Sequence, residues 1–359
     1  MLKIWRERYA ELTRFIASHP EIKIEKSVVR IPESVRSEFY QIFRAAGETF
    51  VREYNQALLN QAEVLSENYI KAEEDITKLL GIEGITNYVP VNRFLHKPID
   101  QFVSGLYHPL FDLLKEQIDI ETYEKRAAVS IDTAFSTYSQ LGYEIWLVLS
   151  IIKLLEADRT YQVEAAEFNE EELFKHGGPI ETPVPDPEEA NGITFTHPPE
   201  VGYIVPDQTV HSVRLGQYFS FRPEIIEALG TATNKSVLRE WLSVSDIVEL
   251  EPNVIVVYAD KQLKELSIIA DTVSFCRPDL IIECVGLNKE YNEDSVLRVQ
   301  TYHKLYKPRL GTYIVSMGQL AEPKPEDSEV GIYYLHVGFD QSKIENIMEL
   351  FIDKEGDGE

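Results

Sequence analysis

The apolar residues of this chain change their spacing between its first and last thirds. From Ser34 to about Leu80 they recur three and four residues apart, as on one face of a helix. After residue 250 they gather in short runs of β-branched and aromatic residues bounded by turn residues. This change predicts an all-α N-terminal domain followed by an α/β C-terminal domain, and 359 residues suffice for two cores.

Two further helices are expected in the first half, at Pro98–Gln117 and Ile120–Glu156. The first should break near Pro109, because proline removes a backbone donor. The longest apolar run, Ile145–Leu155, is too short to span a bilayer and contains Lys153. We therefore expect a buried helix there and not a membrane anchor.

The C-terminal third predicts alternating strands and helices. Strands are expected at Val254–Tyr258, Leu280–Val285, Gly311–Met317 and Gly331–Val337. Helices are expected at Glu293–Lys307 and Gln341–Phe351, with shorter ones at Pro223–Leu229 and Ser236–Leu242. The pattern is that of an α/β domain with a mixed sheet and flanking helices.

The stretch between the two halves has a composition of its own. From Glu164 to Asp207 it is rich in proline and acidic residues and has a single base, Lys175. Such a composition is typical of a linker or a long surface excursion. The predicted domains are therefore a helical domain at 1–160, an acidic Pro-rich linker or excursion at 161–210, and an α/β domain at 211–355.

The net charge limits which binding partners the chain can have, and the cysteine content indicates its cellular compartment. The chain has 35 Lys+Arg and 60 Asp+Glu, a formal charge of -25, which repels nucleic acid and anionic membranes at long range. Any DNA contact must therefore be local. Cys276 and Cys284 are too few for a disulfide framework or a four-cysteine metal cluster. With no signal-peptide core at the N-terminus, we expect a soluble cytoplasmic protein without membrane contact.

The segment Gln262–Phe275 decides between two folds. Leu263, Leu266, Ala270 and Val273 give a helical stripe, which would produce a βαβαβ order and a Rossmann-like parallel sheet. The same segment also alternates as a strand, which would produce a βββαβ core. Its β-branched content favours the strand.

Three carboxylates concentrate near this segment. With the strand interpretation, Asp271 lies in one strand, and Asp279 and Glu283 lie on one face of the next because they are four residues apart. Carboxylates that converge on one sheet face repel one another unless a hard cation such as Mg²⁺ joins them. Such a site can activate water for phosphodiester hydrolysis.

These residues also carry a family resemblance. The run Arg277-Pro-Asp-Leu-Ile-Ile-Glu-Cys-Val-Gly286, a helix with Gln300, and the strand Gly311-Thr-Tyr-Ile-Val-Ser316 resemble the core of the PD-(D/E)xK, or restriction endonuclease-like, nuclease superfamily. The resemblance implies that Asp271 or Asp279 is the first metal-binding acid and Glu283 the second. It also implies that Gln300 supports the site.

One position departs from that family's pattern. The lysine that orients water two residues after the Glu is replaced by Val285. Lys289, or Lys304 on the following helix, is the alternative amine; otherwise the site is degenerate and only binds.

A second resemblance lies in the helix before the linker. The run Leu141-Gly-Tyr-Glu-Ile-Trp is similar to a helix of some large restriction-type nucleases, where the Glu approaches the metal. It implies Glu144 as a further ligand.

The charge balance reverses near the end of the helix that carries Gln300. Arg298, His303, Lys304, Lys307 and Arg309 follow one another without an intervening acid. Such a basic helix end suits contact with a phosphate backbone, although it is also typical of an ordinary solvated helix face.

These features together predict a metal-dependent DNA nuclease or a degenerate relative that acts in DNA restriction or processing. The helical domain would supply target recognition, a protein partner or a homo-oligomer contact. The alternatives are a non-enzymatic interaction or scaffold protein on the same fold, and a Rossmann-like nucleotide or small-ligand sensor. The sequence contains no glycine-rich dinucleotide or P-loop motif.

Overall fold

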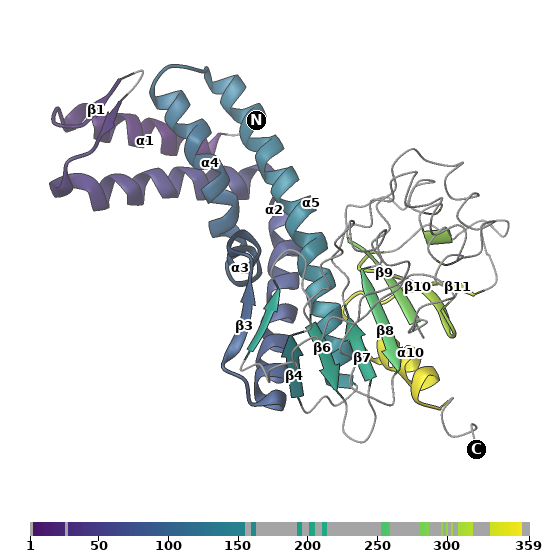
Figure 1. Ribbon diagram of the computed structural model, residues 1–359. Coiled ribbons are helices and arrows are strands. Elements are labelled where there is room, and N and C mark those ends of the chain that lie inside the picture. Colours follow the sequence, from purple (N-terminus) through teal and green to yellow (C-terminus); the bar gives the residue numbers. More distant parts are fainter. Residues whose placement is uncertain are drawn as a thin grey trace, which may run out of the picture. The chain divides into compact units, whose positions relative to one another are not determined.

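A computed structural model describes most of the helical first part of the chain and the later part in segments. The described residues are 3–25, 28–154, 159–162, 192–195, 201–204, 210–213, 253–258, 280–286, 296, 299, 300, 303, 308–318 and 331–353. They fall into two compact units: a helical unit of Met1–Ile70 and Val89–Gly142, and a sheet unit of Lys71–Tyr88 and Tyr143–Glu359. The predicted combination of a helical N-terminal part and an α/β C-terminal part is confirmed (Figure 1).

Long helices dominate the first part of the chain. In chain order the elements are α1 (Ile4–Ser18), the antiparallel pair β1 (Lys23–Ile24) and β2 (Val29–Arg30), α2 (Glu33–Leu80), α3 (Val89–His96), α4 (Pro98–Leu114) and α5 (Ile120–Leu154). The backbone of α2 leaves helical geometry at Asn55. The Oδ1 of Asn55 accepts the backbone N–H of Leu58 at 3.0 Å, so this side chain caps the second half of α2.

The predicted break near Pro109 is wrong, because α4 continues through this residue to Leu114. A proline at position 109 leaves the carbonyl of Gly105, four residues earlier, without its helical donor. The hydroxyl of Ser130 on α5 approaches that carbonyl at 3.4 Å. A neighbouring helix therefore replaces part of the lost bonding, and the buried face of α4 stays continuous.

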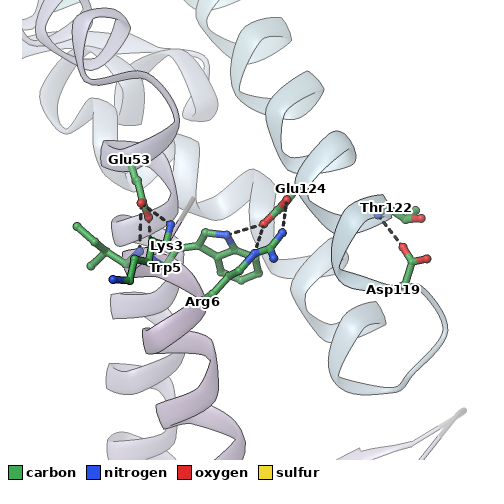
Figure 2. Close-up of polar contacts among 8 residues, drawn as sticks. Lys3, Trp5, Arg6, Glu53, Asp119, Thr122 and Glu124 are labelled. Carbon is green, nitrogen blue, oxygen red and sulfur yellow. Dashed lines mark hydrogen bonds and ion pairs between the residues drawn. The ribbon is translucent and has the colours of Figure 1, made fainter. Parts of the chain in front are cut away.

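Aromatic side chains fill the core of the helical unit around Trp5. Trp5 is fully buried, and its ring centroid lies 4.8 Å from that of Tyr123 and 5.4 Å from that of Phe50. Two carboxylates hold the start of α1 in place. Figure 2 shows Glu53 facing the first backbone N–H groups of α1 and Glu124 reaching both the indole of Trp5 and the guanidinium of Arg6.

Short strand pairs occur in the sheet unit before its main sheet. Strand β3 (Gly84–Asn87) pairs in parallel with β5 (Gly192–Phe195), and β4 (Arg159–Gln162) pairs antiparallel with β6 (Val201–Ile204). Strands β5 and β6 lie inside the stretch predicted as a linker or excursion. The division between units also differs from the predicted boundary at residue 160, since the chain from Tyr143 onward belongs to the sheet unit.

Among the described residues, the main sheet has five strands in the order β11-β10-β9-β8-β7. They are β7 (Val210–Val213), β8 (Val254–Tyr258), β9 (Leu280–Val285), β10 (Gly311–Ser316) and β11 (Ile332–His336), and helix α10 (Gln341–Asp353) follows. The pairs β7–β8 and β8–β9 are antiparallel, whereas β9–β10 and β10–β11 are parallel. Figure 1 shows β8 to β11 side by side.

The four strands and the last helix predicted in this region are confirmed: two strands have the predicted ends, and the ends of the other elements differ by at most two residues. The segment 262–275 and the short helices expected at 223–229 and 236–242 lie outside the described residues. A Rossmann-like sheet would require β8 and β9 to run parallel, but they are antiparallel.

The C-terminal end of α5 is buried within the sheet unit. Every residue from 143 to 152 is buried, as expected for a helix segment in which all residues but Glu144 and Ser150 are apolar or aromatic. Trp146 meets the ring of Phe339 edge-on at 5.0 Å, and Gln341 on α10 donates a hydrogen bond to Ser150 at 3.3 Å. No helix in the described part of the chain has the length and apolarity needed to cross a bilayer.

Candidate functional site

Strand β9 carries a charged residue at the centre of the sheet. All six of its residues are buried, which fits a strand covered on both faces. Glu283 is only 1% exposed. A carboxylate at this depth loses most of its hydration, so it is retained only where it is paired or serves a ligand. Glu283 is therefore the first candidate for a functional side chain.

The strand register shows which residues share the face of Glu283. Glu283 pairs with Ile314 of β10, and Val285 pairs with Ser316. Paired residues on neighbouring strands point to the same side, and so do alternate residues along one strand. Glu283, Val285 and Ser316 therefore lie on one face. Val285, where the family resemblance implies a lysine, is 3% exposed.

Asn253 connects this strand to α5. Its Oδ1 accepts the backbone N–H of Cys284 at 2.7 Å, and its Nδ2 donates to Oε1 of Glu144 at 2.8 Å. Glu144 is 3% exposed. One amide side chain thus fixes a second buried carboxylate beside the residue that follows Glu283.

Aromatic packing holds Glu144 in position. The neighbouring Tyr143 stacks on Trp146 with ring centroids 5.5 Å apart, and it meets Phe339 edge-on at 5.9 Å. Burial raises the pKa of Tyr143, and the nearby Cys284 raises it further. Tyr143 therefore stays neutral near physiological pH, and α5 lies close to β9 at this point.

The structure describes some of the predicted site residues and not others. Those outside the described residues are Asp271, Asp279, Lys289, Arg298, Lys304 and Lys307. Gln300 is half-buried and helical, as predicted, and Arg309 is exposed. Of the predicted ligands, Glu144 is hydrogen-bonded to Asn253, and Asn253 in turn bonds the backbone of Cys284, the residue that follows Glu283.

Asn253 was not among the residues that the sequence predicted for the site. It follows Pro252 and directly precedes the apolar run of β8. A Pro-Asn pair before a strand indicates a turn, and an asparagine in a turn bonds neighbouring backbone groups. That signal predicts a local contact, whereas Asn253 bridges two distant segments.

The polar groups on the face of Glu283 are oxygen donors. Glu283 supplies a carboxyl group, and Ser316 supplies a hydroxyl whose Oγ has no hydrogen-bond partner in the protein. Glu144 is linked through Asn253 to the backbone N–H of Cys284, whose side chain points to the other face of the sheet. Mg²⁺ prefers oxygen ligands and keeps several waters. Among the residues that the structure describes, no group of three or more His, Cys, Asp and Glu side chains is arranged to hold a metal. Asp279, which directly precedes β9, is the further acid that the resemblance implies.

No family model, no curated protein and no solved structure matches this chain. The resemblance to nucleases therefore rests on the residues quoted for it, and the chemistry of the site must be inferred from its side chains.

Proposed function

We propose that this chain is a metal-dependent deoxyribonuclease of the restriction endonuclease-like type, or a relative that has lost the activity. The observation that carries the proposal is Glu283, a carboxylate buried in the central strand β9, with Glu144 fixed beside that strand by Asn253. Two buried acids from segments far apart in sequence are costly to fold around. A ligand that needs oxygen donors gives a reason to keep them.

The directions of the strands are compatible with this proposal. In the described part of the chain, β7, β8 and β9 are antiparallel neighbours, and the helical residues 296, 299, 300 and 303 come before β10, which is parallel to β9. The predicted βββαβ core has the segment 262–275 as its middle strand, and this segment lies outside the described residues, so the described strands support only a mixed α/β sheet. Fold alone does not define an activity, so the proposal depends on the acids and not on the sheet.

The proposed roles follow the chemistry of each side chain. Glu283 and Asp279 bind the metal, Asp271 and Glu144 are further carboxylates, and Gln300 supports the site. Lys289 or Lys304 orients the water, and Arg298, Lys307 and Arg309 contact the phosphate backbone. Magnesium, when bound, lowers the pKa of its water and stabilises the leaving oxygen.

Cleavage of plasmid and single-stranded DNA with Mg²⁺ or Mn²⁺ tests the proposal. We expect the wild type to cleave and Glu283→Gln to lose activity by at least about a hundredfold, because the variant keeps the shape of the side chain but not its charge. Glu38→Ala is the matched control, since Glu38 is an exposed acid of the helical unit. Equal inactivity of the wild type and Glu283→Gln would contradict the enzyme.

One observation favours a second candidate, a non-enzymatic interaction protein on the same fold. Val285 occupies the position of the lysine and is buried, so no amine reaches the site from β9. A net charge of -25 also opposes DNA binding. This candidate predicts no cleavage with any divalent cation and no change in DNA affinity when Arg309 is replaced by Ala.

A further inference from the structure

Ser316, the last residue of β10, has a buried hydroxyl without a partner. The residue is 1% exposed, and its Oγ makes no hydrogen bond to the protein. A buried polar atom in this condition lowers the stability of the fold, and native proteins contain few of them. The backbone around it is well bonded, since its carbonyl accepts the N–H groups of Val337 and Gly338. The missing partner thus concerns the side chain alone.

The same strand contains a second buried hydroxyl that is satisfied. Thr312 is fully buried, and its Oγ1 is 2.8 Å from Nδ1 of His303. Thr312 and Ser316 are four residues apart on β10, so they share a face of the sheet. The Thr312 hydroxyl therefore has a structural role, whereas the Ser316 hydroxyl bonds no other group of the protein.

The position of Ser316 suggests what its hydroxyl serves. Its register partner is Val285, the residue that replaces the lysine, and Glu283 lies two residues before Val285 on the same face. Directly paired residues lie about 5 Å apart and diagonal ones about 7–8 Å apart. Ser316 and Glu283 are therefore diagonal neighbours on one face of two adjacent strands.

We propose that Ser316 is a positioning residue of the Glu283 site, whose hydroxyl hydrogen-bonds a water molecule that belongs to the shell of a divalent cation at Glu283. The inference rests on the proposed function, because it assumes that Glu283 serves a cation. A hydroxyl can orient a water through one donor and two acceptor positions, but it supplies no positive charge. Ser316 thus takes over the orienting part of the lysine's role from the neighbouring strand.

Titration of the full chain with MnCl₂ by calorimetry tests the inference, with the thermal midpoint of the metal-free protein as a second readout. We expect Ser316→Ala to bind Mn²⁺ about tenfold more weakly, as is usual for residues that support a metal through its ligands. Its thermal midpoint should stay at or above that of the wild type, because no protein hydrogen bond is lost. Ser316→Thr, which keeps the hydroxyl, should retain most of the affinity.

Thr312→Val is the matched control on the same strand. We expect it to lower the thermal midpoint, because His303 loses a bond, and to leave the Mn²⁺ affinity unchanged. A Ser316→Ala variant with wild-type affinity, while Glu283→Gln no longer binds, would overturn the inference and leave the proposed function standing. The inference would also be overturned if Ser316→Ala lowered the thermal midpoint as much as Thr312→Val does. If the wild type binds no Mn²⁺ at all, both the inference and the metal site are wrong.

Discussion

Two kinds of carboxylate differ in their burial. Those that hold α1 in the helical unit are partly exposed, whereas the carboxylate in the centre of β9 is buried. Glu53 and Glu124 lie at the rim of their unit, and their partners are backbone N–H groups, an indole and a guanidinium (Figure 2). Glu283 lies in a strand whose six residues are all buried. Folding explains the first two, because Glu53 accepts backbone N–H groups that the start of α1 leaves open, and Glu124 accepts the side-chain N–H groups of Trp5 and Arg6. The burial of Glu283 costs more hydration than the positions of the two rim acids do.

The largest effect is expected at the fully buried Trp5 of the helical unit. Trp5→Ala should lower the free energy of unfolding by about 3–5 kcal/mol, because it removes a fully buried ring from between Phe50 and Tyr123. Urea denaturation followed by circular dichroism measures this. Ile4→Ala is the control: Ile4 is 57% exposed, and its loss should cost no more than about 0.5 kcal/mol. Equal losses in the two variants would show that α1 is not anchored by Trp5.

A smaller effect is expected for the carboxylate that caps α1. Glu53 accepts the backbone N–H groups of Lys3, Ile4 and Trp5 at 2.6, 3.1 and 2.8 Å, although it belongs to a different helix. Glu53→Ala should therefore cost about 0.5–2 kcal/mol, as the loss of an N-cap does. Glu38→Ala, at an exposed acid of the same helix, should be close to neutral in the same urea experiment. If Glu53→Ala left the free energy of unfolding unchanged, Glu53 would not be needed to hold α1.

The same two carboxylates predict how the helical unit responds to acid. Burial raises the pKa of Glu53, but three backbone N–H groups outweigh it and lower the pKa below the ordinary 4.5. The Arg6 guanidinium chiefly lowers the pKa of Glu124, with help from the Trp5 indole against partial burial. A carboxyl group whose pKa is lower in the folded than in the unfolded state stabilises the fold at pH values above its unfolded pKa. This stability is lost as the pH falls below about 4.5 through the folded values.

Urea denaturation between pH 7 and pH 3 measures this loss. We expect the free energy of unfolding to be level at the upper end and to fall at the acidic end. Glu53→Gln should start lower and fall less steeply, since it removes one of the titrating groups. Wild-type and variant curves that run parallel down to pH 3 would exclude Glu53 from the acid response.

The sequence predicted local structure better than long-range contacts. The strands Val254–Tyr258 and Leu280–Val285 were predicted with the ends that the structure gives them, because β-branched runs between turn residues are a local signal. The continuity of α4 through Pro109 could not be predicted, since it depends on Ser130 from another helix. The parallel pairing of β3 with β5 joins segments more than a hundred residues apart, and no local pattern specifies it.

The candidate site divides in the same way. The Glu in β9 was found because an acid stands out in an apolar run, and Glu144 because it lies in a recognisable helix motif. Asn253 and Ser316 were missed. Each matters only through its neighbour in space, Glu144 for the first and Val285 for the second. Common polar residues at strand ends have no distinctive sequence signal, so the register and the hydrogen bonds had to be seen first.

The smallest expected change in stability concerns Glu283 itself and is the sharpest test of the comparison. Glu283→Gln keeps the size of the side chain but removes a buried charge, and sites kept for function are often stabilised when such a charge is removed. We therefore expect its free energy of unfolding to match or exceed that of the wild type in metal-free buffer, while Mn²⁺ binding is lost. The matched substitution Glu53→Gln should lower stability, because its backbone donors bond best to a charged acceptor. If Glu283→Gln is instead the less stable of the two, Glu283 has a structural role like that of Glu53, and its burial no longer indicates a ligand.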